Sequence, residues 1–338
     1  MSESKKVKSK RILAIDYLKA FAAILVILTH VLSKTERIKI WGPFWISMAV
    51  PIFMVLSGFT NSLSADKKGL NSLKELYQKD IIMREFNIFL SPYLIIILLE
   101  LFIGLYQLFI LKAGPFLSYT IKDFVIYFLT GGTTPGSYYI PIMFQFILLF
   151  PLMYRSYRKA GKKSVYFFLV LHFLFDFLAN YFPIPTEIYR LLIFRYLAFI
   201  ILGIALYFSY QEVKNSVKYM NLLSVAYILA YTFGYRFKMF SKWPNTALPT
   251  VFWAVTLVII GMELLEKNPN HLVSDLLMNI GKASYYVFLM QKFLFGFGLN
   301  NFLNSMGLNS VGRSVFAVVI CCSLGLTFYR LDRMGVSK

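Results

Sequence analysis

The protein has 338 residues, of which 58% are hydrophobic and 15% are charged, whereas an ordinary soluble domain has about 25% charged residues. Its 35 Lys and Arg outnumber its 16 Asp and Glu, which gives a formal net charge of +19. A soluble globule cannot bury so much apolar surface, and a nucleic-acid-binding protein would spread its cations over a polar face. Here the cations separate long apolar runs, so we expect an all-α, polytopic integral membrane protein with no nucleic-acid partner.

A helix needs about 20 apolar residues to cross the hydrocarbon core of a bilayer, and about ten stretches of the chain qualify. Their approximate bounds are 12–32, 44–64, 87–111, 137–154, 164–182, 190–208, 217–235, 246–265, 282–302 and 312–329. The first run is too long for a cleavable signal and has no cleavage site after it, so we expect it to remain in the protein. We therefore expect one transmembrane domain over residues 12–329, between a basic N-terminal segment, 1–11, and a tail, 330–338.

The loop charges predict the orientation of the spans, because short basic loops stay in the cytoplasm. With the N-terminus inside, the inner segments hold 22 Lys and Arg and the outer segments hold 10. We therefore expect both termini to be cytoplasmic in a multi-pass protein of a bacterial cell membrane. The topology, together with attraction to anionic lipid, explains most of the net charge.

Ionisable side chains inside a membrane are costly, and each is a candidate functional residue. On the first span, Asp16, Lys19 and His30 share one face at 100° per residue. Asp16 and Lys19 lie at the cytoplasmic edge, where an anchoring ion pair is an equally good interpretation. His30 lies about 21 Å further along the helix, where its imidazole is suited either to proton transfer or to a structural hydrogen bond.

The fifth and sixth spans carry a second group of ionisable residues. His172 and Asp176 are four residues apart on one helix face, which suits either an oriented base or a buried polar pair. Arg195 is placed to meet Asp176 or an anionic substrate group. Weaker candidates are Glu100, Glu263 and Lys292. We expect no metal site, because His30, His172 and His271 lack ligand spacing and the adjacent Cys321 and Cys322 lie in an apolar run.

Several strings together resemble the acyltransferase type 3 family of integral membrane acyltransferases, in order and over nearly the whole chain. The first is residues 11–30, which begins with Arg11, holds Asp16 and Lys19, and ends with His30. The others are Leu-Ser57-Gly58-Phe59, Gly136-Ser-Tyr-Tyr139 with the later Pro151, Phe199-Ile-Ile-Leu-Gly203, and Ile280-Gly281-Lys-Ala-Ser284-Tyr285.

The resemblance implies transfer of an acyl group, most often acetyl, from cytoplasmic acyl-CoA to a hydroxyl of an extracytoplasmic polysaccharide or glycan precursor. It implies that His30 is the essential histidine, which we expect to act as general base with Asp16 as a second catalytic residue. Basic side chains suit the phosphates of CoA, and Arg11, Lys19 and Arg84 are the candidates. Ser57 and Tyr139 are candidate substrate contacts, with His172, Asp176 and Arg195. Acyl-CoA is then a co-substrate, with no permanently bound cofactor, and polysaccharide-synthesis proteins are candidate partners.

The sequence departs from the family pattern at two places. The Arg-x-x-Arg motif appears as Arg84-Glu85-Phe86-Asn87, and a histidine of the later helix is replaced by Gln291. These changes mark either a different acyl donor or a member that no longer catalyses. A transporter or flippase of a polysaccharide or lipid-linked sugar is the main alternative, although the two halves of the chain show no repeat symmetry. A non-enzymatic scaffold for polysaccharide synthesis is the third.

Overall fold

The computed structural model describes residues 3–110, 112, 116, 119–132, 134, 136–182, 184–235, 237, 239–240, 243–267 and 271–336. Within these ranges it leaves out the side chains of residues 3–12, 266–267, 271–274 and 335–336. All regular structure in the described ranges is helical, without a strand, which confirms the expected all-α fold.

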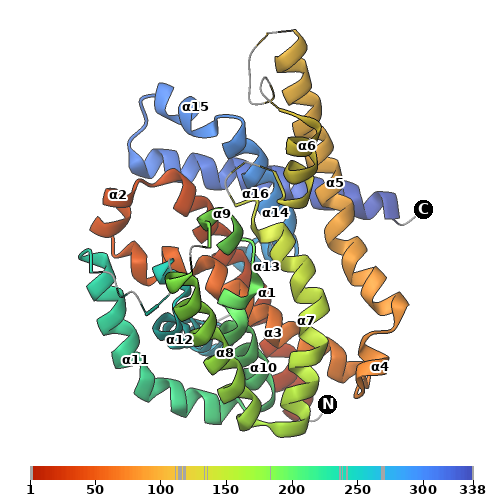
Figure 1. Ribbon diagram of the computed structural model, residues 1–338, viewed down its shortest axis with the longest axis vertical. Helices are drawn as coiled ribbons and strands as arrows, with labels where there is room; N and C mark the ends of the chain where they lie inside the picture. The colour runs from red at the N-terminus through yellow and green to blue at the C-terminus, as the bar shows by residue number, and fades with distance from the viewer. Residues whose placement is uncertain are drawn as a thin grey trace.

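The helices are numbered in chain order (Figure 1). The α-helices are α1 (Glu3–Val31), α2 (Lys34–Lys39), α3 (Ala49–Lys67), α4 (Leu73–Leu76), α5 (Lys79–Phe109), α6 (Ile121–Leu129), α7 (Tyr139–Ala160), α8 (Lys162–Tyr181), α9 (Thr186–Tyr189), α10 (Leu197–Phe208), α11 (Tyr210–Thr232), α12 (Leu248–Lys267), α13 (His271–Lys282), α14 (Ser284–Gly296), α15 (Leu299–Ser305) and α16 (Ser310–Val336). Short 3₁₀ helices are η1 (Gly42–Phe44), η2 (Ile46–Met48), η4 (Ile193–Tyr196) and η5 (Pro244–Thr246).

Seven stretches in the described part of the chain are long and apolar enough to cross a membrane, which confirms a polytopic membrane protein. They are Leu13–Val31, Gly42–Lys67, Lys79–Phe109, Tyr139–Ala160, Lys162–Tyr181, Leu248–Leu265 and Ser310–Met334. The sixth expected span is the shorter apolar stretch Ile193–Phe208. The other two expected spans correspond to α11, whose first half is polar, and to α14, which has 13 residues.

The structure differs from the expected segments in three places. The basic N-terminal segment is helical from Glu3 and continues directly into the first span as α1. The expected inner loop 266–281 contains α13, which packs against α1. The expected ninth span is divided between α14 and α15 at Gly298, whose φ of 91° lies in the left-handed region that glycine adopts without strain.

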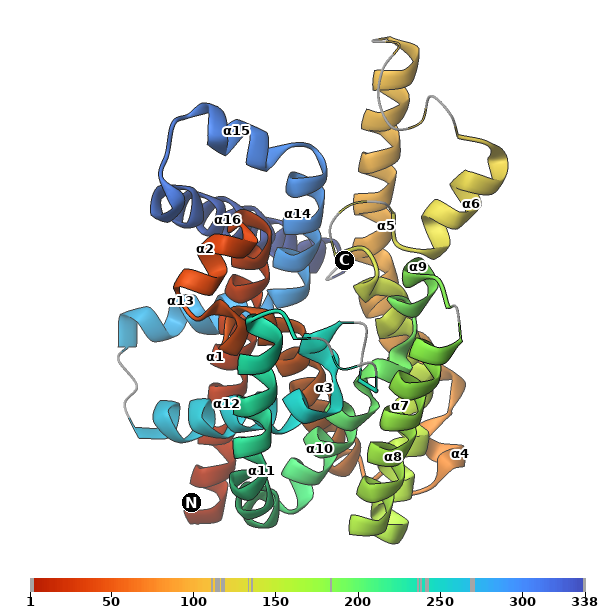
Figure 2. The same ribbon diagram turned by 60° about the vertical axis from the view of Figure 1, so that its left-hand side comes forward.

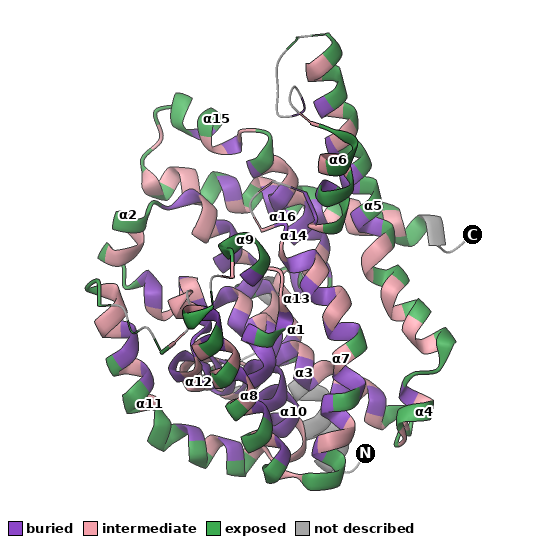
Figure 3. Ribbon diagram, in the orientation of Figure 1, coloured by how far each residue is buried: buried purple, intermediate pink, exposed green. Residues whose placement is uncertain are grey.

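The core of the molecule lies where α1, α3, α10 and α12 meet, as the concentration of buried residues in Figure 3 shows. Helix α10 is buried along ten of its residues, from Leu197 to Leu206. The far end of α5 and the neighbouring α6 stand away from this core (Figure 2). Helix α16 crosses the molecule at a steep angle to α5 and α7 (Figure 1).

Two glycines of the family-like strings allow α3 and α10 to pack closely. A Cβ atom at Gly58 would overlap the backbone carbonyl of Ile200, and one at Gly203 would overlap the carbonyl of Val55. Small residues at such positions let helix backbones approach within a membrane, where packing contributes more than hydrophobic burial. Gly281 plays the same part between α13 and α1, because its Cβ position would overlap the carbonyl of Asp16.

Candidate active site

His30 lies at the end of α1 and faces a cavity. Asn300 holds this helix end by donating a hydrogen bond from Nδ2 to the backbone carbonyl of His30, at 2.9 Å. The imidazole packs against the ring of Phe295, with 5.6 Å between ring centroids. No described residue forms a hydrogen bond with the imidazole, and the ring is only partly buried. Its nitrogens are therefore free to bind a ligand.

The cavity next to this ring, here called the His30 cavity, has a volume of about 380 Å³. Its walls come from α1, α2, α3, α7, α11, α14 and the segment around η5. Lys34 and Arg37 supply two cations, and no Asp or Glu lies among the described residues of its lining. Its other polar and aromatic lining residues include Thr29, Ser47, Tyr138, Tyr139, Tyr231, Trp243 and Asn245.

A second cavity of about 240 Å³ lies further toward the N-terminal end of α1 and is here called the Lys19 cavity. Three basic residues line it: Lys19 from α1, Lys282 at the end of α13, and Arg333 near the end of α16. Lys282 and Arg333 are exposed, so this cavity opens to the surface at its basic end. Ser57 lies in this cavity and does not line the one that holds His30.

The two cavities meet at a common wall of four residues, which are Val26, Val50, Tyr139 and Phe288. The ring of Tyr139 packs against that of Phe288 at an angle of 56°, with 4.9 Å between ring centroids. Lys19 and His30 lie on either side of this wall, about 16 Å apart along α1 at 1.5 Å per residue. Lys19 and His30 thus face two adjoining cavities, whereas Asp16, which was expected on the same helix face, lines neither.

The other candidates near the N-terminal end of α1 occupy different places. The side chain of Arg11 is outside the described residues. Asp16 lies beside Gly281 of α13 and lines neither cavity. Arg84 is exposed on α5, where its Nη2 lies 3.1 Å from the carboxylate of the neighbouring Glu85, and it also lies outside both linings.

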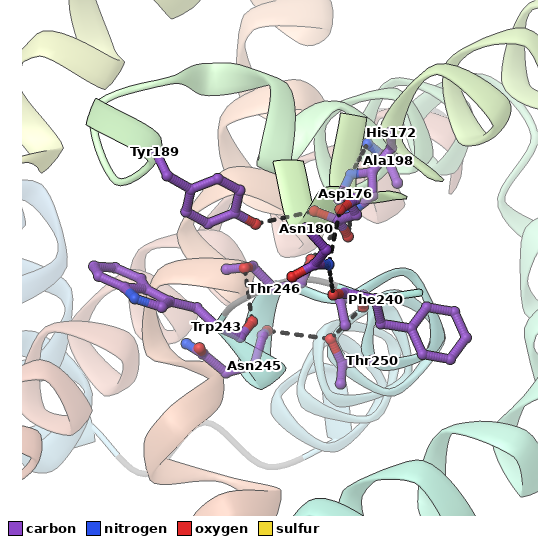
Figure 4. A network of polar contacts seen from close by, with 11 residues as sticks. His172, Asp176, Asn180, Tyr189, Ala198, Phe240, Trp243, Asn245, Thr246 and Thr250 are labelled. Carbon is purple, nitrogen blue, oxygen red and sulfur yellow. Dashed lines mark hydrogen bonds and ion pairs between the residues drawn. The ribbon is translucent and has the colours of Figure 1, made fainter. Parts of the chain in front are cut away.

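His172 and Asp176 are buried together on α8 (Figure 4), and neither side chain lines either cavity. The backbone N–H of Ala198 points at Nδ1 of the imidazole from 3.4 Å, so the ring proton belongs on Nε2. Nε2 then donates to the carbonyl of Thr246 at 3.0 Å and lies 3.4 Å from Oδ2 of Asp176. Because both ring nitrogens are engaged, this geometry favours the buried polar pair over the base.

Arg195 is fully buried among aromatic rings near that pair. Its guanidinium carbon lies 4.1 Å from the ring centroid of Trp243 and 4.6 Å from that of Tyr196. Nη2 donates to the hydroxyl of Tyr196 at 2.6 Å, and no carboxylate of the described residues pairs with it. Tyr189 lies between Arg195 and Asp176. Its hydroxyl donates to Asp176 Oδ1 at 3.0 Å (Figure 4), and its ring centroid lies 5.9 Å from the guanidinium carbon.

Sequence reasoning overlooked four cations that the fold brings to the cavities. Lys34 and Arg37 follow His30 within seven residues but were counted only as loop charge. Lys282 stands inside a family-like string, directly after Gly281, and Arg333 lies in the tail. Lys34 and Arg37 could have been predicted from their closeness in sequence to His30, and Lys282 from its closeness to Gly281. Nothing in the sequence predicts that Arg333 lies beside Lys19.

Comparison with known proteins identifies the family. A family model described as an acyltransferase domain, of the acyltransferase type 3 family, matches residues 12–330. No curated protein and no solved structure matches the chain. The match covers nearly the whole chain, and it includes His30, the three glycine contacts and all the lining residues of both cavities except Arg333. The chain therefore belongs to the acyltransferase type 3 family of membrane acyltransferases.

Proposed function

We propose that this protein transfers an acetyl group from cytoplasmic acyl-CoA to a hydroxyl of an extracytoplasmic polysaccharide or glycan precursor. The observation that carries the proposal is the pair of adjoining cavities: three cations line one, and the other holds His30, whose imidazole has no hydrogen-bond partner among the described residues. A donor with phosphates at one end and a reactive thioester at the other suits that arrangement, because it must span the two. The proposed location is the cell membrane, because the donor lies in the cytoplasm and the acceptor lies outside it.

The Lys19 cavity is the proposed site for the phosphates of CoA. Lys19, Lys282 and Arg333 offer charge-assisted hydrogen bonds to phosphate oxygens there. Of the residues expected from the sequence to bind the donor, Lys19 is the one described side chain that lines this cavity. Asp16, one turn before it, is proposed to balance its charge. The pantetheine arm then passes alongside the contacting rings of Tyr139 and Phe288 toward His30.

His30 is proposed to act as general base on the acceptor hydroxyl. The hydroxyl oxygen attacks the carbonyl carbon of the thioester, and its proton passes to the imidazole. The carbon–sulfur bond breaks, and the imidazolium returns the proton to the CoA thiolate. The products are an acetyl ester and CoA–SH, so atoms and charge balance without any other reactant. Tyr139 at the wall between the cavities is the proposed hydroxyl contact for the thioester oxygen.

Replacing His30 with Ala tests this proposal. We expect His30→Ala to lower transfer of radiolabelled acetyl from acetyl-CoA into alkali-labile surface glycan by about 10²–10⁴-fold, because the general base is lost. The measurement uses membranes from cells of the source organism in which the variant replaces the native protein. Glycan labelling at the native rate by a well-inserted variant would rule out His30 as the base.

A binding measurement separates lost chemistry from lost structure. Purified native protein and His30→Ala in detergent should bind acetyl-CoA with the same affinity, since Lys19, Lys282 and Arg333 remain in place. Lys122, exposed in the first turn of α6, offers a control. Lys122→Gln should keep both binding and transfer. Failure of the native protein to bind acetyl-CoA would contradict the proposal and favour transport of a lipid-linked sugar or polysaccharide.

A further inference from the structure

The two cations of the His30 cavity, Lys34 and Arg37, have no carboxylate partner among the described residues. Arg37 is half-buried, and its Nε atom is buried without a hydrogen-bond partner. No described residue forms an ion pair or hydrogen bond with the side chain of Lys34 or Arg37. A buried guanidinium N–H without a partner costs free energy, and a bound anion would remove that cost.

The adjacent carboxylate of Glu36 does not neutralise Arg37, because it is already engaged elsewhere. Arg313 of α16 donates to Glu36 Oε1 at 2.8 Å, and the hydroxyl of Ser310 donates to the same oxygen. The backbone N–H of Ser33 donates to Oε2 at 2.7 Å. These hydrogen bonds, with that from Ser310 the largest cause, lower the pKa of Glu36 to about 2. The carboxylate therefore stays ionised at neutral pH and remains bound to α16.

The two cations lie in the cavity proposed for the acceptor and not in the cavity proposed for the donor phosphates. Lys34 and Arg37 line the His30 cavity and are absent from the lining of the Lys19 cavity. Lys34 is exposed, so the cavity opens beside it, at the end of α1 that carries His30. A ligand that enters here meets both cations and the free imidazole in one space. Because Tyr138 and Trp243 lie in the same lining, the space offers aromatic faces as well as charge.

We propose that the acceptor is acidic, and that Lys34 and Arg37 bind a carboxylate or phosphate of the acceptor while its hydroxyl reaches His30. The inference rests on the proposed acyl transfer, and it adds the chemical class of the acceptor. Arg37 supplies a planar pair of donors for two oxygens of the acid group, and Lys34 supplies a point charge at the opening. The acid group thereby fixes the acceptor so that one hydroxyl faces the imidazole.

Binding to the His30→Ala variant without acetyl-CoA tests this inference independently of catalysis. The probes are trigalacturonate, its fully methyl-esterified form, glucose 1-phosphate and glucose, each measured by titration calorimetry in detergent. We expect at least one acidic probe to bind about tenfold or more tightly than its neutral counterpart, which corresponds to one charge-assisted contact. The carboxylate and phosphate pairs distinguish the two possible acid groups. Equal binding of acidic and neutral probes in both pairs would overturn the inference.

Substitutions in the same background assign the contact to the two cations. Arg37→Gln and Lys34→Gln should each remove most of the preference for the acidic probe, and Arg37→Lys should retain part of it. Lys39→Gln is the matched control, because Lys39 is exposed on α2 and does not line the cavity. An acid preference that survives Arg37→Gln with Lys34→Gln would overturn the assignment. Acetyl-CoA binding should be unchanged in all these variants, and its absence would instead refute the proposed acyl transfer.

Discussion

At the scale of single residues, the charges inside this membrane protein fall into distinct environments. Glu100 and Lys292 form a fully buried ion pair with 2.5 Å between Oε1 and Nζ, and the hydroxyl of Tyr127 donates to the other carboxylate oxygen at 2.7 Å. Arg195 is surrounded by aromatic rings. His30 has a free imidazole in a cavity. Of these three environments, only that of His30 leaves a titratable group available to a substrate, which is why His30 is the proposed base.

Removing one member of the Glu100–Lys292 pair should destabilise the protein much more than removing both. Lys292→Met leaves a buried carboxylate without its cation and should reduce the free energy of unfolding by about 3–5 kcal/mol. Adding Glu100→Leu should recover most of that loss. The midpoint of thermal unfolding in detergent measures both effects.

A second ion pair provides the control for this prediction. Lys214 and Glu263 also lie 2.5 Å apart, but their side chains are 41% and 39% exposed. Lys214→Met should therefore cost no more than about 1 kcal/mol. If Lys292→Met and Lys214→Met reduced the free energy of unfolding equally, the prediction that burial makes loss of the cation more costly would be wrong.

At the scale of elements, the family-like strings owe part of their pattern to helix contacts. The glycine of Leu-Ser57-Gly58-Phe59 and Gly203 of the later string lie at the same α3–α10 interface, against backbone atoms of the opposite helix. Gly281 makes the equivalent contact with α1. These contacts determine how close α3 and α13 lie to their neighbours, and both helices carry lining residues of the cavities.

Adding a single methyl group at Gly203 tests the importance of that interface. Gly203→Ala should lower the free energy of unfolding by about 1–3 kcal/mol through overpacking, although alanine favours a helix by about 1 kcal/mol over glycine. Gly312→Ala on α16 is the control, because its Cβ would meet mainly the Asn309 and Leu308 side chains. It should be neutral or stabilising in the same thermal assay. A Gly203→Ala protein as stable as Gly312→Ala would contradict this account of the string.

At the scale of the whole molecule, the orientation of the protein in the membrane decides which cavity faces the cytoplasm. The proposed reaction needs the Lys19 cavity on the cytoplasmic side and the His30 cavity on the opposite side. The loop charges predict that orientation, because the inner segments carry most of the Lys and Arg. The donor would then enter from the side where acyl-CoA is made.

Cysteine labelling tests the orientation directly. Cys321 and Cys322 are buried, so the native background should be low. A membrane-impermeant maleimide should label Lys39→Cys in intact cells, because α2 is expected outside, and should label Lys74→Cys on α4 only after permeabilisation. Both positions are exposed. The reverse pattern would invert the topology and place the His30 cavity in the cytoplasm.

The sequence by itself determined the membrane class, the helical fold, and the placement of Lys19 and His30 on one face. These properties depend on composition and on the helical period, which are local. Only the tertiary structure decided which charges meet. Glu100 and Lys292 are 192 residues apart, and Arg333 joins Lys19 from the other end of the chain. Cavities and ion pairs arise where distant helices pack, and no local pattern specifies which faces of those helices will meet.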